Sequence, residues 1–443
     1  MSGREASDPA APREDRRRAA IHTLGCRLNQ SESGILVDLL RREGYEIVPF
    51  GESADLGVVH TCTVTREADA KSRRLIRSFI RANPRAYVAV LGCYAQTGHQ
   101  ALAAIEGIDL ICGNQEKMNL LEFVRQGKNP TPLIIRDHLQ RADFTLEFAG
   151  DAPTERRANL KIQDGCNFMC SFCVIPFARG RSRSREMGNL LDEARALIAR
   201  GAKELVLTGV NLGCYTCEGL TIVDVVNNLN GLPGLARIRI SSIEPTTVPG
   251  ELLDCMAEPA HALAPYLHLP LQSGSDAVLR RMKRRYTRRE FVEFVETACR
   301  RVPDLCVGTD ILVGMPGESD AEFEETCAVL RDAPIAYAHV FKYSERDGTA
   351  SQRMPDKVDP KTVNRRSARI RRISAAKRQA FYERYLGASV EVLFEQQQDG
   401  WWEGYTGNYV RVAARSSKRL RNEFGRVRVE SIRGDIAIGA LND

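Results

Sequence analysis

Short apolar runs alternate with amphipathic, helix-like segments along the first part of the chain. Between residues 19 and 127, segments such as SESGILVDLLRREG separate the runs AAIHTLGC, ADLGVVHTC, AYVAVLGC and GIDLICGN. This alternation predicts a three-layer α/β domain with a parallel sheet. Ligands of such sheets lie beyond the carboxyl ends of the strands. Cys26, Cys62 and Cys93 each follow a predicted strand, so we expect their thiols to meet at this edge.

A second alternating region, on a larger scale, covers residues 155–384. Its strand candidates are ANLKI, ELVLTG, RIRISSIEP, YLHLPLQ, LCVGTDILVG and YAHVFKYS. Six strands with helical stretches between them predict a complete or partial (βα)6 barrel, whose active site is built from the loops after the strands. The loop DGCNFMCSFC follows the first of these strands, so we expect it at the active end.

The other segments differ in pattern from these two regions. Residues 1–18 have the composition of a disordered, charged tail, and residues 128–154 that of a linker. The barrel region ends in a basic helical segment up to residue 384, which we interpret as a solvated helix between domains. Residues 385–443 contain short alternating runs with Gly turns and predict a small all-β, OB-like barrel.

Composition narrows the class of protein. The chain has 443 residues, a formal net charge of +6 and no apolar run approaching the ~20 residues of a membrane span. The amino terminus lacks the apolar middle of a secretory signal, so we expect a cytoplasmic protein without a membrane partner. Thirteen cysteines is an odd number, which does not suit a fully paired disulfide scaffold. In a reducing compartment, clustered thiolates usually bind metals.

The loop after the first barrel strand carries the most specific motif. Cys166, Cys170 and Cys173 have the spacing C-x3-C-x2-C, with Phe172 before the last cysteine, and no fourth Cys or His follows closely. Structural zinc sites normally present four ligands. Three thiolates on a cubane iron–sulfur cluster leave one iron open for a substrate or cofactor. The motif favours an iron–sulfur cluster, with structural zinc as the alternative.

With this loop the sequence resembles the radical S-adenosylmethionine (SAM) enzymes. The resemblance implies that the open iron of a [4Fe–4S] cluster binds the methionine moiety of SAM and delivers an electron to its sulfonium. The product is a 5′-deoxyadenosyl radical, so the protein has mainly to position its substrates and exclude water.

Further motifs resemble the methylthiotransferase family within these enzymes. They are TLGCRLNQSES, HTCTVT, VLGCYAQ, LTGVNLG, RISSIEP, LHLPLQSGSDAVLRRMKRRYT, DILVGMPGE and FKYSERDGTAS, and with the carboxy-terminal segment the match covers roughly residues 20–443. By this resemblance Cys26, Cys62 and Cys93 hold a second, auxiliary [4Fe–4S] cluster. The carboxy-terminal segment is similar to the TRAM domain, an RNA-binding β-barrel.

The motif at the first cysteine bears on the substrate. GCRLNQSES is closer to the G-C-K-V-N-Q form of the branch that acts on N6-threonylcarbamoyladenosine next to the tRNA anticodon. The G-C-Q-M-N form, typical of enzymes that act on isopentenyladenosine, and the G-C-P-K-N form, typical of those that modify a ribosomal-protein aspartate, fit less well. A zinc-containing RNA-binding protein without catalytic activity is the alternative from another class.

The family mechanism implies several cofactors and partners. One SAM methylates a sulfur at the auxiliary cluster, and a second SAM supplies the radical that removes hydrogen from C2 of the adenine. An external sulfur donor and a reductant protein such as flavodoxin or ferredoxin are also implied. The macromolecular partner is the anticodon stem-loop of tRNA.

The residues expected to contact SAM and RNA rest on weaker sequence patterns than the cysteine motifs. Residues at or near predicted strand ends and the aromatic of the cysteine loop are expected to contact SAM: Phe172, Thr208, Gly209, Glu244 and Gln272. Glu244 and Gln272 have the alternative role of satisfying loop backbone groups. Basic residues beside the cysteine loop and in the last domain are expected to contact RNA phosphates: Arg179, Arg181, Arg183, Arg185, Lys418, Arg419 and Arg421.

Two features remain open from the sequence. Cys214 and Cys217 form a C-x2-C pair that the branch usually lacks, and they either bind metal, form a disulfide in air or have no role. Trp401, Trp402, Tyr405 and Tyr409 suit base stacking, although one Trp could instead fill the barrel core.

Overall fold

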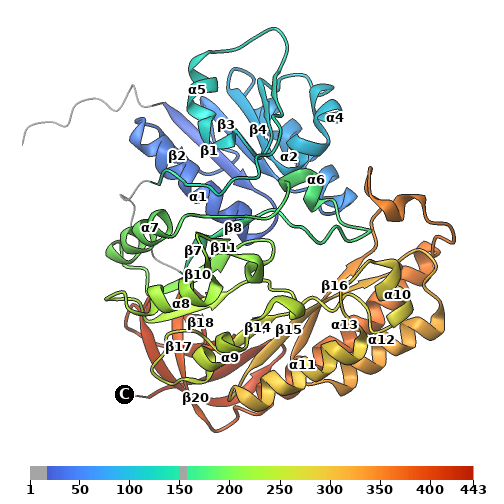
Figure 1. Cartoon of the computed structure of the whole chain (residues 1–443). Helices are drawn as coiled ribbons and strands as arrows, with labels where there is room; N and C mark the ends of the chain where they lie inside the picture. The colour runs from blue at the N-terminus through green and yellow to red at the C-terminus, as the bar shows by residue number, and fades with distance from the viewer. Residues whose placement is uncertain (1–16, 149–156, 443) are drawn as a thin grey trace, which may run out of the picture.

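The amino-terminal domain is a parallel six-stranded sheet in the order β2-β1-β3-β4-β5-β6. It is seen at the top of the computed structural model, which describes residues 17–148 and 157–442 (Figure 1). The strands are β1 (Arg18–Thr23), β2 (Glu46–Val48), β3 (Leu56–Thr61), β4 (Tyr87–Gly92), β5 (Leu110–Cys112) and β6 (Leu133–Ile135). The four strands that the sequence predicts here are present, and the short β2 and β6 extend the sheet at its two ends. β6 lies within residues 128–154, so part of the expected linker belongs to the sheet.

Helices cover both faces of this sheet. On one face, α1 (Arg27–Arg42) packs Leu36 against Val58 of β3. On the other face, α2 (Arg66–Ala82) packs Ile76 against the next residue of the same strand, Val59. Successive side chains of a strand point to opposite faces, so the fully apolar strands bury both. The predicted three-layer arrangement is confirmed.

The central domain is a partial (βα)6 barrel. Its strands are β7 (Ala158–Lys161), β10 (Glu204–Thr208), β13 (Arg237–Ile240), β14 (Tyr266–His268), β15 (Cys306–Val313) and β16 (Tyr337–Lys342). The sheets β13-β10-β7 and β14-β15-β16 are joined by the bridges Ile238–Leu263 and Ser242–His268. Its helices are α7 (Met187–Ala199), α8 (Ile222–Asn230), α9 (Gly250–Ala257), α10 (Asp276–Arg281), α11 (Arg288–Arg301) and α12 (Asp320–Asp332).

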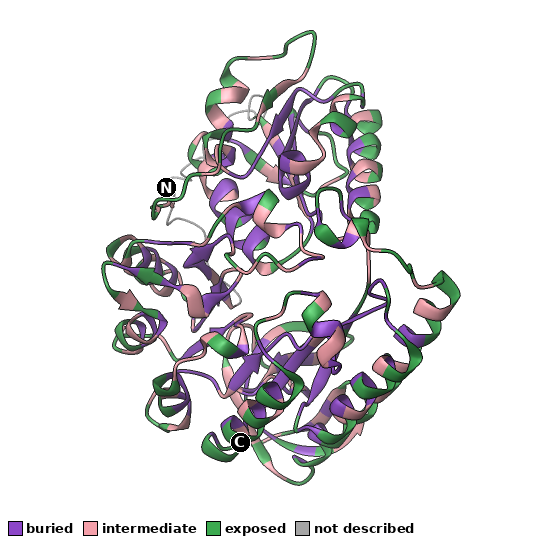
Figure 2. Ribbon diagram, turned by 45° about the vertical axis from the view of Figure 1, so that its right-hand side comes forward, coloured by how far each residue is buried: buried purple, intermediate pink, exposed green. Residues whose placement is uncertain are grey.

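The basic segment forms one long helix, α13 (Pro360–Glu383), which leads from the barrel to the last domain. It is not wholly solvated, because one side packs against β16. Ser374 exchanges hydrogen bonds with the backbone of Ala338, at 2.8 and 2.9 Å, and Ile370 is buried in the barrel core. The colouring by burial shows exposed residues on the outer sides of the helices and buried strands behind them (Figure 2).

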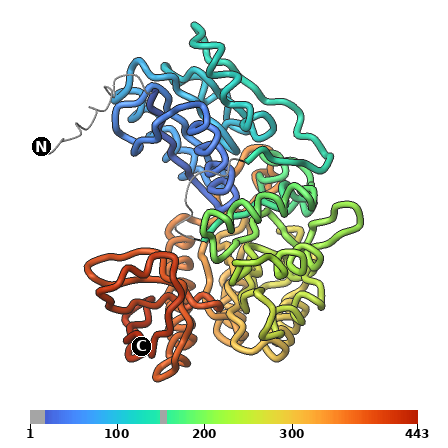
Figure 3. The backbone as a smooth tube through the Cα atoms, turned by 90° about the vertical axis from the view of Figure 1, so that its left-hand side faces the viewer, coloured from blue at the N-terminus to red at the C-terminus, as the bar shows by residue number. Residues whose placement is uncertain are grey.

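The carboxy-terminal domain is a closed five-stranded barrel in the order β17-β18-β19-β21-β20. Its strands are β17 (Ser389–Gln398), β18 (Trp401–Tyr405), β19 (Arg411–Arg415), β20 (Phe424–Arg433) and β21 (Ile436–Leu441). Trp402 fills its core, whereas Trp401 lies outside beneath the guanidinium of Arg415. This small barrel lies beside the central domain and below the amino-terminal domain (Figure 3). Within residues 17–148 and 157–442, no helix has the length and apolar character to span a bilayer.

Candidate functional site

Three thiols of the amino-terminal domain gather at the carboxyl edge of its sheet. Cys26 is the N-cap of α1, Cys62 follows β3, and Cys93 begins the short helix α3 (Cys93–Thr97) after β4. Because β1, β3 and β4 are neighbours, their ends lie side by side. A Cβ added to Gly25, which has a φ of +102°, would lie 3.0 Å from the Cys62 Sγ atom. Only glycine therefore lets the Cys26 loop approach Cys62 this closely.

Two asparagines that the sequence analysis missed brace these thiols. Asn29 donates hydrogen bonds to the carbonyls of Leu24 (2.8 Å) and Thr61 (3.0 Å), which ties the Cys26 loop to the end of β3. Asn114 lies 3.5 Å from the Cys93 Sγ atom and donates to the carbonyl of Ala178, at 2.7 Å. Ala178 belongs to α6 (Ile175–Arg179), the helix that follows the second cysteine loop. The bracing of the first thiol set thus extends directly to the second.

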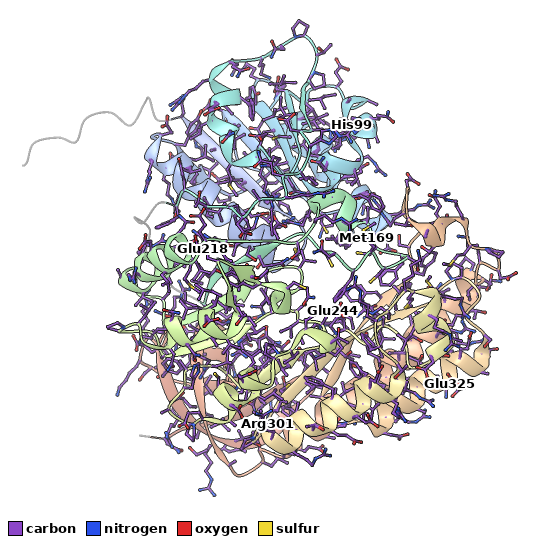
Figure 4. The ribbon with its side chains drawn as sticks, in the orientation of Figure 1. His99, Met169, Glu218, Glu244, Arg301 and Glu325 are labelled. Carbon is purple, nitrogen blue, oxygen red and sulfur yellow. The ribbon has the colours of Figure 1, made fainter. Side chains whose placement is uncertain are left out.

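The second set of thiols lies in the loop after β7. The amide of Cys173 donates to the carbonyl of Cys170 at 3.0 Å, and the amide of Phe168 approaches the Cys166 Sγ atom at 3.4 Å. All three thiols are partly exposed. Met169 in this loop and Glu244 after β13 lie in the same central region between the amino-terminal domain and the barrel (Figure 4).

A buried arginine from the segment KRRYT completes this loop. Arg284 donates to the Cys170 Sγ atom (3.2 Å), to the Pro270 carbonyl (3.1 Å) and to the carboxylate of Glu244. Burial raises the pKa of Glu244 despite the opposing effect of Arg284. Arg284 places one positive charge beside a thiol set that becomes anionic on binding iron. Its position in the sequence motif gave no sign of this contact.

Burial disfavours the thiolate form in both sets of cysteines. Burial raises the pKa of the Cys166 thiol to about 11 and those of Cys62 and Cys173 to about 12, so metal binding must release protons. In the described part of the chain, no three Cys, His, Asp or Glu side chains converge tightly enough to hold a single metal ion. Thiolates that each bind a different iron of a cubane lie further apart than the ligands of one zinc ion.

A cavity of about 530 Å³ lies inside the barrel and reaches the first thiol set. Cys26 and Arg27 line one end, strand residues including Thr208 and Asp310 line the wall, and Tyr409 of the last domain closes the floor. Cys170 and Glu244 instead line a separate, small pocket together with Arg284. The cavity therefore adjoins the first thiol set, and the second set lines a pocket of its own.

Comparison with known proteins agrees with this geometry. The model of the uncharacterized protein family UPF0004 matches residues 18–113, and that of the Radical SAM superfamily matches residues 160–330. Threonylcarbamoyladenosine tRNA methylthiotransferase MtaB of Bacillus subtilis is 36% identical over 93% of this chain and 93% of its own length. The tRNA-2-methylthio-N(6)-dimethylallyladenosine synthase of Desulfotalea psychrophila is 32% identical over 87% of this chain and 90% of its own length.

The chain belongs to the radical SAM methylthiotransferase family.

The fold of this methylthiotransferase is shared with a solved structure at low identity. The radical SAM methyltransferase TsrM of Kitasatospora setae superposes with a TM-score of 0.53 at 16% identity, covering 74% of this chain and 75% of that chain. Membership of the radical SAM superfamily implies that the methylthiotransferase uses SAM and a [4Fe–4S] cluster. The spacing of Cys166, Cys170 and Cys173 is the sequence feature on which the expectation of this cluster rests.

Of the four arginines beside the cysteine loop that are expected to contact RNA, three are buried in the methylthiotransferase. Arg179 is 1% exposed, Arg183 is 8% exposed and Arg185 is 0% exposed. Arg185 pairs with Glu193 and donates to Asn189 at 2.7 Å, and Arg183 donates to Gln115 at 3.2 Å. The expectation of a four-arginine rim is therefore wrong for Arg179, Arg183 and Arg185, because their guanidinium groups are used inside the protein. Arg181 is exposed.

Arg179 is part of a buried ionic cluster between the first two domains. It donates to Asp164 at 2.9 Å and to Glu32 of α1 at 3.1 Å, and Glu32 also pairs with Lys117 (2.5 Å) and Lys161 (2.7 Å). Burial opposes the ionisation of Glu32, but Arg179, Lys117 and Lys161 hold its pKa well below its usual range. Arg183 also approaches Asp164, at 3.7 Å, so four cations face two carboxylates here, and the charge of Arg179 acts on the Cys62 thiol of the first set.

The residues expected to contact SAM fall into two groups. Thr208 and Gly209 line the cavity, and Glu244 lies beside the second thiol set. Gln272 has a left-handed φ of +67°, and its backbone N–H donates to the Asp310 carbonyl at 2.8 Å. This hydrogen bond pairs the segment after β14 with β15. Phe172 packs on a small apolar cluster that includes Met282 and Leu312.

The other residues singled out from the sequence are separated by the fold. Cys214 lies near Cys166 and Glu244, whereas Cys217 is buried in a small hairpin near Asp143, so the pair does not face one common site. Lys418 and Arg419 are exposed in the loop after β19, and Arg421 is half-buried in the same loop. Tyr405 and Tyr409 line the cavity instead of the outer surface.

Proposed function

We propose that the protein is a tRNA methylthiotransferase that adds a methylthio group to C2 of N6-threonylcarbamoyladenosine beside the anticodon. The observation that carries the proposal is a cavity of about 530 Å³ that extends from Cys26 of the first thiol set into the barrel whose first loop holds the second set. The name and near-complete coverage of the MtaB relative support the same substrate. The isopentenyladenosine, ribosomal-protein and zinc-binding alternatives are not favoured.

In this proposal the chain holds its cofactors through named residues. Cys166, Cys170 and Cys173 would hold the cluster that, together with SAM, supplies one-electron chemistry, and Cys26, Cys62 and Cys93 would hold a second [4Fe–4S] cluster. Thr208, Gly209, Glu244 and Gln272 would orient SAM at the barrel mouth, while Phe172 packs the loop beneath it. Their work is positioning and exclusion of water, since an adenine C2–H offers no acidic proton to a base.

The remaining partners are also part of the proposal. Two SAM molecules per turnover, a sulfur donor and a reductant protein such as flavodoxin or ferredoxin would be needed. The exposed Arg181, Lys418 and Arg419, together with Arg421, would contact phosphates of the stem-loop, where cationic side chains supply most of the affinity. Such a reaction belongs in the cytoplasm.

Mass spectrometry of tRNA nucleosides tests this function. Cells that lack the gene should lose 2-methylthio-threonylcarbamoyladenosine and regain it when the gene is restored. Cells carrying Cys62→Ser should not regain it, because the second cluster would lack one ligand. An unchanged level of this nucleoside in the deletion strain would refute the proposed substrate.

Iron analysis of the protein purified without oxygen tests the two-cluster arrangement separately. We expect about eight irons per chain, and about four when all three cysteines of either set are changed to Ser. Changing Cys306, a buried cysteine of β15, to Ser is the control and should leave the iron content unchanged. A zinc-loaded, colourless protein would contradict both cluster assignments.

A further inference from the structure

Arg27 is a cation in the cavity without an acidic partner. It lies directly after Cys26, lines the cavity and is half-buried. Within residues 17–148 and 157–442, its guanidinium forms no ion pair with a carboxylate and donates to the hydroxyl of Tyr409. A phenol oxygen leaves most of the five donors of a guanidinium free. Arg27 can therefore bind an anion that enters from outside the chain.

The other arginines that line the cavity each have a carboxylate partner among the described residues, unlike Arg27. Arg239 pairs with Glu204 at 2.7 Å, and Arg411 pairs with Glu403 at 2.8 Å. Arg378 approaches Asp435 at 4.0 Å. Arg27 thus supplies the uncompensated charge at the end of the cavity that meets the first thiol set.

The position of Arg27 in α1 is unfavourable for the helix alone. It occupies the first helical residue, where a positive charge is repelled by the helix dipole, and the first turn of α1 contains no acidic residue. The backbone N–H groups of this turn and the guanidinium together give this end of the cavity a positive potential. Helix stability does not favour an arginine at this position, whereas an anionic ligand in the cavity would.

A buried hydroxyl group in the cavity has no hydrogen-bond partner within residues 17–148 and 157–442. The hydroxyl of Thr208, at the end of β10, is 1% exposed and has no hydrogen-bond partner among the described residues. Buried hydroxyl groups are rarely left unpaired without a reason. This group and Arg27 line one hollow, so the cavity is built to receive a polar molecule.

The proposed substrate has the matching chemistry. A threonylcarbamoyl group on N6 of adenine carries a free carboxylate, whereas a dimethylallyl group in the same place carries no charge. C2 and C6 both flank N1, so a residue beside the thiols that serve C2 also faces the edge bearing the N6 substituent. We propose that Arg27 binds the carboxylate of this substituent and thereby selects threonylcarbamoyladenosine. This inference rests on the proposed function.

Binding of anticodon stem-loops to the two-cluster holoenzyme tests the role of Arg27. Dissociation constants are measured at fixed salt for stem-loops with threonylcarbamoyladenosine, dimethylallyladenosine or plain adenosine at the target position. We expect the unchanged protein to prefer the first by about tenfold to a hundredfold, the usual worth of a charge-assisted contact. Arg27→Gln should remove most of this preference, Arg27→Lys should keep part of it, and neither should alter the affinity for plain adenosine more than about twofold.

Controls separate the possible sources of the effect. Arg74→Gln removes the same charge from an exposed position on α2 and should leave the preference unchanged. Iron content and the SAM dissociation constant are measured for every variant. If Arg27→Gln weakens SAM binding, the guanidinium binds the methionine carboxylate and the inference is wrong. A retained preference, or equal weakening for all stem-loops, also overturns it.

The same experiment distinguishes failure of the proposed function. An unchanged protein that favours and modifies the dimethylallyl stem-loop would refute the substrate itself. An unchanged protein that modifies the threonylcarbamoyl stem-loop while Arg27→Gln discriminates equally well would refute only the role of Arg27.

Discussion

At the scale of single residues, burial divides side chains that look equivalent in the sequence. Arg179, Arg181, Arg183 and Arg185 alternate along one basic stretch, yet three are buried and Arg181 is exposed. The sequence could not reveal this, because the carboxylates that receive Arg179 and Arg185, Glu32 and Glu193, come from other elements. Cysteine spacing, by contrast, is local, and the fold gathers each predicted thiol set at its expected edge.

Arg284 offers the sharpest prediction at this scale. Replacing it with Met removes the donor to Cys170 and leaves the half-buried Glu244 without its cation. We expect SAM cleavage to slow by at least about tenfold, or about 1.4 kcal/mol in activation free energy, because Cys170 and Glu244 lose the cation that holds them in place. Reductive cleavage of SAM to 5′-deoxyadenosine, followed by chromatography, measures the effect.

A matched change at Arg280, on α10 four residues before Arg284, serves as the control. Arg280→Met removes the same charge from a position without a contact to the thiols and should cleave SAM at the normal rate. Equal rates for Arg284→Met and the unchanged protein would show that the guanidinium is not needed at the cluster loop.

At the scale of elements, the alternation of strand and helix patterns in the sequence predicted most of the fold. Apolar strands such as β4 and β15 are buried, and their continuous apolar runs make them easy to predict from the sequence. The strands β2 and β6 have three residues each and lie at the sheet edges, so their pattern is too short to separate from a loop. The buried ion pairs that link α1 to the cysteine loop also could not be predicted, because their partners lie far apart in the sequence.

This junction predicts a large effect of Arg179→Met on stability. The change leaves Glu32 and Asp164 with fewer cations inside the protein, and breaking a buried ion pair typically costs about 3–5 kcal/mol. We expect a clear fall in the apparent melting temperature of the amino-terminal and barrel domains, measured by calorimetry. Arg195→Met, which removes an exposed ion pair with Asp192, should change it little. Equal melting temperatures for the two variants would contradict the role of the cluster.

At the scale of the whole molecule, the cavity is shared by three domains. Tyr409 of the last domain stacks on Tyr266 of the barrel, with ring centroids 4.8 Å apart. Arg27 of the first domain donates a hydrogen bond to the Tyr409 hydroxyl. The sequence placed Tyr409 on an RNA-binding surface, because a small β-barrel with aromatics is typical of that role. Which face an aromatic occupies depends on how the domains dock, and periodicity within one strand does not report that.

Tyr409→Ala therefore tests how the last domain is held. Loss of the stacked ring should loosen the contact between the barrel and the small domain while both remain folded. Hydrogen–deuterium exchange should rise in β14 and in the turn after β18, and remain unchanged in the sheet of the first domain. Trp401→Ala, on the outer side of the small barrel, is the control and should leave both regions protected. Unchanged exchange in Tyr409→Ala would show that this ring does not hold the domains together.

Transfer of hydrogen from C2 tests the central claim most directly. The reduced holoenzyme is given SAM, a sulfur source and a stem-loop whose threonylcarbamoyladenosine carries deuterium at C2. The account predicts that deuterium appears in 5′-deoxyadenosine in step with formation of the 2-methylthio product. Deuterium that stays in the adenine while 5′-deoxyadenosine forms without it would contradict the account.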